Sequence, residues 1–388
     1  MSPSSNQIPF EQYGKPYAGI DVGHIDNFSI GSNLYCSMPN HFDNLYNGIV
    51  SNRTSLKIQN SEFKNILTNE WLGYLPPKGN AIYLRSPSNN QLKIQGNGIN
   101  SPAMFENCRY GVWADGGDLS ITGVYMKSMF QGVNYFGWND MSNILINNNR
   151  IEAGYMGIEV NNLLPANHVD ILYNRVNLFP TWGLDIQPLN SMNYPTLNFG
   201  IHVSSILNNP FVHVSRDTVY SFGKTFAGID LIGCDNATVN ANTIHLDSSR
   251  NSWNGINFSD CENLECNKNI ITGTSAFDSL LNKANYPVAL HYNFSHGTYQ
   301  CNEVSLINTG VRFEGDNLNT QLRITRFDNH HTGLLVDKSA LLDQHPHAAN
   351  YWETGGSFNA KPINLDTNSK LLGLFTFQNT PSVFDPHG

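Results

Sequence analysis

The sequence predicts an all-β fold in which one long solenoid of short parallel strands takes up most of the chain. A glycine followed by an apolar, a variable and an apolar residue recurs at nearly constant intervals: Gly132 and Gly157 are 25 residues apart, and Gly228 and Gly255 are 27 apart. Once per interval stands an apolar alternation framed by asparagine, such as NILINNNRI at 143–151. No long helical period intervenes. A fixed period of this length indicates a repeat architecture.

Each interval is long enough for one turn of a solenoid. Alternation over four or five residues is a strand signal, and about 25 residues at about 3.3 Å each can form three short strands and three turns. We therefore predict a single right-handed parallel β-helix of roughly twelve triangular coils over residues 17–337. A leucine-rich repeat lacks support because its Leu-x-x-Leu-x-Leu frame is missing, and a propeller needs periods near about 40 residues.

The framing asparagines are expected to form a ladder along the solenoid. Asparagine tolerates the left-handed backbone conformation better than other residues with a side chain. It can therefore occupy the sharp turn between two strands while its amide bonds the asparagine one coil away. The candidates are Asn149, Asn174, Asn242, Asn269 and Asn302.

The repeat divides the chain into three parts. Residues 1–16 form an N-terminal lead-in, 17–337 the β-helix, and 338–388, which are richer in aromatic residues and proline, a C-terminal cap and connector. Inserts at 69–78, 188–198 and 272–287 are expected to leave the coils as outside loops. Because end coils need caps and little precedes the first coil, we expect the chain to be part of a larger polypeptide.

Composition narrows the classes of partner. Charged residues make up 14% of the chain, against about a quarter in average proteins, and the net charge is -9 without a cluster of Lys or Arg. Nucleic acid is therefore not an expected partner. No apolar stretch reaches the roughly 18 residues of a membrane helix, so membrane insertion is not expected either. The cysteines lack the spacing of zinc ligands, and the sequence suggests no cofactor.

Two cysteines are expected to stack on adjacent coils. Cys234 and Cys261 each stand six residues after the glycine of their coil. The coil spacing matches the Cα separation of a disulfide, about 4.4–6.8 Å. Two free thiols packed as small apolar residues are the alternative.

The repeat also resembles a known family. The cadence of GIDLIGCDNATVNANTI (228–244) and GINFSDCENLECNKNII (255–271) is similar to that of the pectate-lyase-like family of right-handed parallel β-helices, over about 17–337. The C-terminal segment resembles those that follow such repeats in large secreted surface proteins of Bacteroidetes. The resemblance implies an extracellular or cell-surface protein. It leaves the function open among polysaccharide lyases, hydrolases, epimerases, adhesins and passive stalks.

A second resemblance, to one class of hydrolases, covers only part of the motif set of that class. SHGT at 295–298 and RIT at 323–325 are similar to the Gly-His-Gly and Arg-Ile-Lys motifs of polygalacturonase-type hydrolases. Those enzymes place Asp just before the glycine of the repeat, where this chain has Ala227 and Asn254, and they carry an Asp-Asp pair that this sequence lacks. His296 and Arg323 are therefore not assigned a catalytic role.

The variable residue of the glycine motif should point away from the core, so stacking would align these residues in an outward column. It reads Asn134, Glu159, Asp185, Asp230, Asn257, His291 and Arg312, with His202 included if Gly200 opens its own coil. Carboxylates beside imidazole, guanidinium and aromatic groups suit sugar binding and acid-base cleavage. We predict Glu159, Asp185, Asp230 and His291 as catalytic candidates, and as ligand-binding candidates Trp182, His202, Trp253, Asn257 and Arg312.

The chemistry of the column depends on which residues are neighbours. If Glu159 and Asp185 are adjacent, their backbones lie about 4.8 Å apart, and two carboxylates so close should raise the pKa of one of them, which would give a proton donor. A Ca²⁺ ion held between them is an alternative. The simpler interpretation is that outward positions are polar because water is there. The inserts at 188–198 and 272–287 could wall a groove and bring Tyr194 and Phe277 near a sugar.

Two functions follow from these features. The first is a secreted or cell-surface module, monomeric, with a structural or adhesive role and a polysaccharide or surface glycan as partner. The second is a carbohydrate-active enzyme, a polysaccharide lyase, glycoside hydrolase or epimerase, with its groove along the acidic column.

Overall fold

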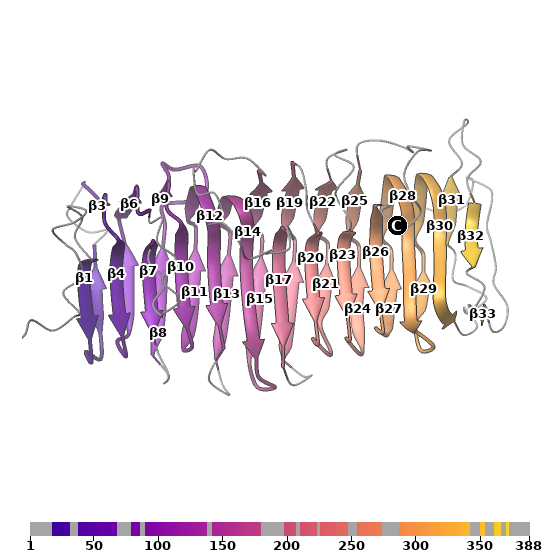
Figure 1. Cartoon of the computed structure of the whole chain (residues 1–388), viewed down its shortest axis with the longest axis horizontal. Helices are drawn as coiled ribbons and strands as arrows, with labels where there is room; N and C mark the ends of the chain where they lie inside the picture. Colours follow the sequence, from indigo (N-terminus) through magenta and orange to yellow (C-terminus); the bar gives the residue numbers. More distant parts are fainter. Residues whose placement is uncertain are drawn as a thin grey trace, which may run out of the picture.

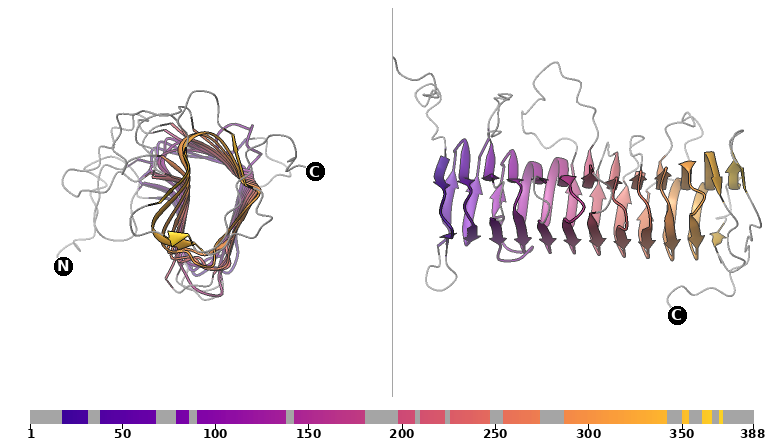
Figure 2. Two further views of the ribbon diagram at one scale, coloured as in Figure 1. Left: turned by 90° about the vertical axis from the view of Figure 1, so that its right-hand side faces the viewer. Right: turned by 90° about the horizontal axis from the view of Figure 1, so that it is seen from below.

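The structure, a computed structural model, is all-β, and every strand pairing in it is parallel. No helix occurs in the part of the chain that the structure describes, which is 18–31, 38–67, 79–85, 90–137, 142–179, 198–206, 210–222, 226–246, 254–273, 287–341, 350–353, 361–365 and 370–371. The strands follow one another along the long axis in chain order (Figure 1), and the coils superpose on one closed outline when viewed from the end (Figure 2). The prediction of an all-β parallel solenoid is confirmed.

Each coil contributes strands to three rows. One row is an 11-stranded sheet made of β2 (Phe28–Ile30), β5 (Leu56–Gln59), β8 (Gln91–Gln95), β11 (Asp118–Thr122), β13 (Asn143–Asn147), β15 (His168–Leu172), β18 (Phe211–Ser215), β21 (Thr238–Asn240), β24 (Leu264–Asn267), β27 (Gly297–Gln300) and β29 (Gln321–Arg323).

The other two rows belong to one continuous 22-stranded sheet. The row that carries the glycine motif, here the glycine row, includes β1 (Ala18–Gly23), β4 (Asn47–Asn52), β7 (Asn80–Arg85), β10 (Tyr110–Asp115), β17 (Phe199–Ser205), β20 (Ala227–Ile232), β23 (Asn254–Ser259), β26 (Val288–Asn293) and β32 (Lys361–Leu365). The return row includes β3 (Asn40–Asp43), β6 (Ser61–Lys64), β9 (Phe105–Glu106), β16 (Arg175–Leu178), β19 (Thr218–Ser221), β22 (Thr243–Leu246), β25 (Ile270–Thr272) and β31 (Tyr351–Glu353). Four long strands pass through both rows: β12 (Tyr125–Phe136), β14 (Arg150–Leu163), β28 (Glu303–Asp316) and β30 (Arg326–Leu341).

The core consists of apolar columns in strand register. Ile158, Ile201, Ile229 and Ile256 pair in succession through β14, β17, β20 and β23, and all four are fully buried. Ile201 therefore holds the place beside Ile158. The segment around Asp185, which the sequence analysis placed in the coil after Glu159, lies outside the described residues.

The glycine motif has a steric cause. A Cβ atom on Gly157 would lie 2.5 Å from the main-chain oxygen of Gly200, and one on Gly200 would lie 2.4 Å from that of Gly228. Successive coils approach too closely there for a bulky side chain. Ala81 and Ala289 stand at the same point beside Gly48 and Gly255, so this position also takes alanine.

The asparagine ladder is present. Asn242 Nδ2 donates to Asn269 Oδ1 and to the main-chain oxygen of Val214, each at 3.0 Å, and Asn269 Nδ2 donates in the same way to Asn302 Oδ1 and the oxygen of Val239. Asn149 and Asn174 repeat the pattern. Each rung thus joins three successive coils.

The predicted backbone conformation of the ladder residues is wrong. The left-handed conformation belongs to the residue before each rung, as in Asn148 (φ 54°), Ala241 (φ 55°) and Lys268 (φ 55°), and to none of the five ladder asparagines. The preceding residue makes the turn, so the asparagine itself can direct its amide into the buried corner of the coil. The ladder therefore depends on hydrogen bonding and not on the backbone preference of asparagine.

The two stacked cysteines are free thiols. Both are fully buried, and the main-chain N–H of Cys234 donates to Cys261 Sγ at 3.3 Å. Burial raises the pKa of Cys261 to about 12 and that of Cys234 well above its usual value. Neither thiol therefore forms the reactive thiolate readily.

We expect Cys234 and Cys261 to resist alkylation in the folded protein and to react only after unfolding. Mass spectrometry of unreduced chain purified from an oxidising compartment measures both properties. The partly exposed Cys301 serves as the reactive reference. A Cys234–Cys261 disulfide in that sample would contradict the expectation.

Parallel pairing continues past residue 337. In register with β30, β31 pairs Tyr351 with Arg326 and β32 pairs Ile363 with Leu334, while β33 (Lys370–Leu371) pairs with the end of β30. Strands of the stack therefore occur within 338–388, where the sequence suggested a cap and connector. The lead-in at 1–16 lies outside the described residues.

Candidate functional site

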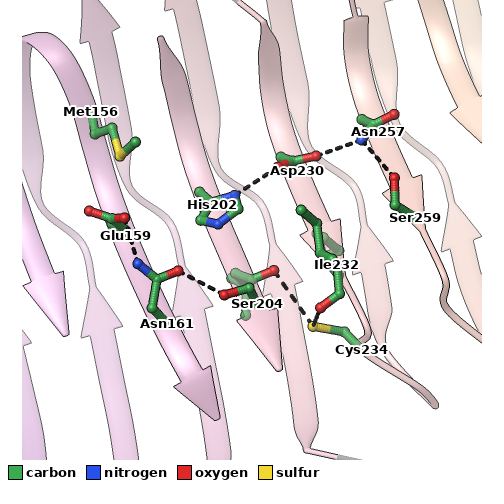
Figure 3. A network of polar contacts seen from close by, with 12 residues as sticks. Met156, Glu159, Asn161, His202, Ser204, Asp230, Ile232, Cys234, Asn257 and Ser259 are labelled. Carbon is green, nitrogen blue, oxygen red and sulfur yellow. Dashed lines mark hydrogen bonds and ion pairs between the residues drawn. The ribbon is translucent and has the colours of Figure 1, made fainter. Parts of the chain in front are cut away.

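A polar column runs along the outer side of the glycine row. Glu159, His202, Asp230, Asn257, His291 and Arg312 pair in succession across β14, β17, β20, β23, β26 and β28. Their neighbours in each strand, such as Ile229 and Leu231, fill the core, so alternation places the column on the opposite side of the sheet. Figure 3 shows its central part. We call these six residues the outer column.

The coil that follows Glu159 differs from one predicted register. Glu159 pairs with Asn134 on one side and with His202 on the other, so Asp185 is not its strand neighbour. A coupled Glu159–Asp185 pair, or a Ca²⁺ ion between them, would require the two residues to be strand neighbours. The pairing of Glu159 with Asn134 and His202 does not give that arrangement. Asp185, Trp182, Trp253, Tyr194 and Phe277 lie outside the described residues, as does most of the two inserts proposed as groove walls.

Asp230 is the centre of the column. Its side chain is 0% exposed, and both carboxylate oxygens have partners: His202 Nδ1 lies 2.7 Å from Oδ2, and Asn257 Nδ2 donates to Oδ1 at 2.6 Å. Because a carboxylate only accepts hydrogen bonds, His202 donates from Nδ1. This leaves Nε2 as the second ring nitrogen, and no described residue hydrogen-bonds it.

Glu159 is held by amide donors from three places. Its Oε2 accepts from Asn134 Nδ2 at 3.0 Å and from Gln131 Nε2, and its Oε1 accepts from Asn161 Nδ2. Asn161 in turn accepts from Ser204 Oγ at 2.8 Å, which connects this group to the coil of His202 (Figure 3). The carboxylate is therefore fixed in position beside the His202 strand.

The column continues as ion pairs at the C-terminal end. His291 Nδ1 lies 2.7 Å from Asn257 Oδ1, and His291 Nε2 lies 3.3 Å from Glu314 Oε2. Arg312 Nη2 contacts Glu314 Oε2 at 3.0 Å and Asp337 Oδ2 at 2.5 Å. Polar contacts thus run without a break from His202 to Asp337.

Water contact does not explain the polarity of the column. Asp230 and Asn257 are 0% and 3% exposed, and the side chains of His202 and His291 are 12% and 15% exposed. Burial of a polar group costs free energy unless the group is hydrogen-bonded or ion-paired. The column is therefore an ordered network in which the side chains of His202, His291 and Arg312 remain partly accessible to solvent.

Sequence reasoning missed some partners of the outer column. Gln131 lies before its glycine, outside the variable position used to read the column, and Asp337 belongs to the last coil of the repeat. His296 and Arg323, the residues of the hydrolase-like motifs, lie away from the column: His296 just before β27 and Arg323 at the end of β29, both on the 11-stranded sheet side.

Two other features, a metal-binding group and a membrane-spanning helix, are not found among the described residues. They hold no group of three or more His, Cys, Asp or Glu side chains arranged to bind a metal ion. They also include no helix with the length and apolar character needed to span a membrane. No protein-family model matches the chain, and no curated protein or solved structure was found to match it.

Proposed function

We propose that the chain is a secreted or cell-surface module of the right-handed parallel β-helix type, with roughly twelve coils, that binds a glycan along the outer column. The single observation that carries this proposal is the continuous polar network from His202 to Asp337. Parallel β-α-β-type crossovers are right-handed in almost all proteins, which supports the hand, and the eleven strands of one sheet support the coil number.

The spacing of the column suits an extended sugar chain. Successive outer residues are one strand apart, about 4.8 Å, which is close to the length of one pyranose unit in an extended polysaccharide. Amide, imidazole and carboxylate groups supply donors and acceptors for hydroxyl groups. The interior is filled by apolar columns, so a ligand has to lie along the outside.

Charge indicates the class of glycan. The outer column and the side chains that contact it contain four carboxylates, Glu159, Asp230, Glu314 and Asp337, and one arginine. Arg312 is paired with two of those carboxylates and offers little charge to a carboxylate ligand. A polyuronate would meet repulsion. We therefore propose that the ligand is a glycan without carboxylates.

The test compares matched ligands and matched variants. Polygalacturonate and its fully methyl-esterified form have the same backbone, so together with neutral galactans and xylans in a glycan panel they separate charge from shape. We expect binding only to uncharged members. Glu159→Gln should abolish it, while Glu265→Gln, an exposed carboxylate on the 11-stranded sheet, should not. Absence of binding to any glycan, or equal binding by both variants, would refute the proposal.

A second function, glycan cleavage, is favoured by one contact. Buried Asp230 fixes His202 with Nδ1–H as donor and Nε2 as the group able to take a proton, an arrangement that suits a general base. In such a reaction His202 Nε2 would take a proton from water or from the sugar.

The chain offers a close control for this second function. His213 lies in the same coil as His202, and its Nδ1 lies 3.4 Å from Asp170, but it belongs to the 11-stranded sheet. If the chain cleaves glycans, His202→Gln should lower the release of reducing ends, or of unsaturated methyl-esterified uronate, at least about a hundredfold, and His213→Gln should leave it unchanged. Equal activity in the two variants would exclude His202 as the base.

A further inference from the structure

The asparagine ladder contains one acidic rung. Asp217 occupies the rung between Asn174 and Asn242: Asn174 donates from its main-chain N–H and from Nδ2 to Asp217 Oδ1, at 2.6 and 2.9 Å, and the N–H of Asp217 donates to Asn242 Oδ1 at 2.9 Å. These are the contacts that the asparagine rungs make with their Oδ1 and N–H groups. Asp217 therefore replaces an asparagine in a run that is otherwise asparagine from Asn149 to Asn302, and Thr325 holds the rung after Asn302.

The second carboxyl oxygen of Asp217 stands where every asparagine rung has a donor. In the rung of Asn242, Nδ2 donates to Asn269 Oδ1 and to the oxygen of Val214. The same register directs Asp217 Oδ2 toward Asn242 Oδ1 and the oxygen of Ile171, and both of these atoms are acceptors. Asp217 is 1% exposed, and its Oδ2 has no hydrogen-bond partner among the described residues.

We propose that Asp217 is a neutral carboxylic acid in the folded protein at neutral pH, with Oδ2–H donating to the main-chain oxygen of Ile171 as an asparagine amide would. A proton on Oδ2 turns an acceptor that faces acceptors into a donor, which restores the bonding of the ladder. An ionised carboxylate would place a buried charge without a cation beside it.

The surroundings of Asp217 agree with a neutral acid. Burial raises the pKa of this carboxyl well above its usual value, opposed by hydrogen bonds from Asn174 and the backbone of Ser215. The groups that contact it from the adjacent coils are uncharged amides. The nearest cation in sequence, Arg216, stacks on Tyr173 at 5.2 Å on the outer surface.

The proposal makes stability depend on pH in a defined direction. The folded protein keeps the proton to a higher pH than the unfolded chain, whose aspartate ionises near 3.8. The stabilising contribution of the proton is therefore complete below that pH and is lost as the pH rises toward the folded pKa. Asp217 and His202 belong to the same coil, because His202 lies in β17 and Asp217 directly precedes β19 of that coil.

The decisive comparison is wild type with Asp217→Asn, measured by denaturant unfolding from acidic to alkaline pH. The ratio of the unfolding equilibrium constants, wild type to variant, should rise about tenfold per pH unit above the unfolded pKa, since one proton is released. Asn242→Asp, which adds a second acidic rung, should steepen this dependence. A ratio that stays constant, or that falls as the pH rises, would overturn the proposal.

A spectroscopic measurement tests the protonation itself without unfolding. The infrared difference spectrum of wild type minus Asp217→Asn at neutral pH should contain the C=O stretch of a protonated carboxyl group. If the variant fails to fold, ¹³C NMR of wild type labelled at the aspartate carboxyls replaces it, and one resonance should then keep the neutral-acid shift at neutral pH. Only ionised carboxylate signals in either experiment would refute the assignment.

Discussion

Replacement of Asp230 by alanine is expected to lower the free energy of unfolding by about 3–5 kcal/mol, the range for removing one partner from a buried pair. The side chain is fully buried and satisfies His202 Nδ1 and Asn257 Nδ2 at 2.7 and 2.6 Å. Alanine leaves both donors in a buried position without an acceptor. Denaturant unfolding monitored by circular dichroism measures the loss.

Asp170 provides the control for Asp230. It also lies between two side chains, with His168 at 3.3 Å and His213 at 3.4 Å, but its side chain is 31% exposed on the 11-stranded sheet. Exposed pairs contribute only about 0–1 kcal/mol. Asp170→Ala should therefore have a small effect. Equal losses for the two variants would show that burial of Asp230 adds nothing to the stability of the outer column.

Replacement of Asn242 by alanine should lower the free energy of unfolding by about 2–6 kcal/mol, because two buried main-chain groups lose partners worth about 1–3 kcal/mol each. The oxygen of Val214 loses the Nδ2 donor, and the N–H of Asp217 loses the Oδ1 acceptor. Both groups lie inside the coil, where water cannot replace the amide.

Asn240→Ala is the matched control for the ladder. Asn240 stands two residues before Asn242 at the end of β21, and its Oδ1 makes no hydrogen bond with described residues. Its removal should change stability by no more than about 0.5 kcal/mol. If the two variants have the same denaturant midpoint, the ladder amides are ordinary turn residues.

The repeat could be predicted from sequence because its causes are local. Glycine recurs where the next coil lies too close for a side chain, as at Gly157 and Gly200, and asparagine recurs where an amide has to satisfy the next turn. Both requirements return over several successive coils, so both leave a period in the sequence. The sequence does not show which of two neighbouring residues takes the left-handed conformation, because the side chain and the turn are adjacent.

The register around the site could not be predicted for two reasons that act together. GLDI at 183–186 copies the glycine motif, whereas the strand that pairs next to β14 in the glycine row is β17, with Gly200. The coil that contains β17 is also hard to recognise in the sequence, because its ladder position holds Asp217 in place of asparagine. A four-residue pattern does not show which of two copies stacks in register. Stacking against Gly228 does.

The burial of the outer column also exceeds what sequence can show. Alternation places Asp230 on the side away from the core, and outward positions are usually in water. The neighbours that contact it, His202 and Asn257, depend on the exact register. Sequence identified the column but not its withdrawal from solvent.

A crystal structure of the chain with an oligosaccharide from the glycan panel is the most direct test of the central claim, that the outer column is the ligand surface. The account predicts sugar density along β14, β17, β20, β23 and β26, with hydroxyl groups within hydrogen-bond distance of Glu159, His202 or His291. Density on the 11-stranded sheet or on the return row, with the outer column free, would contradict it.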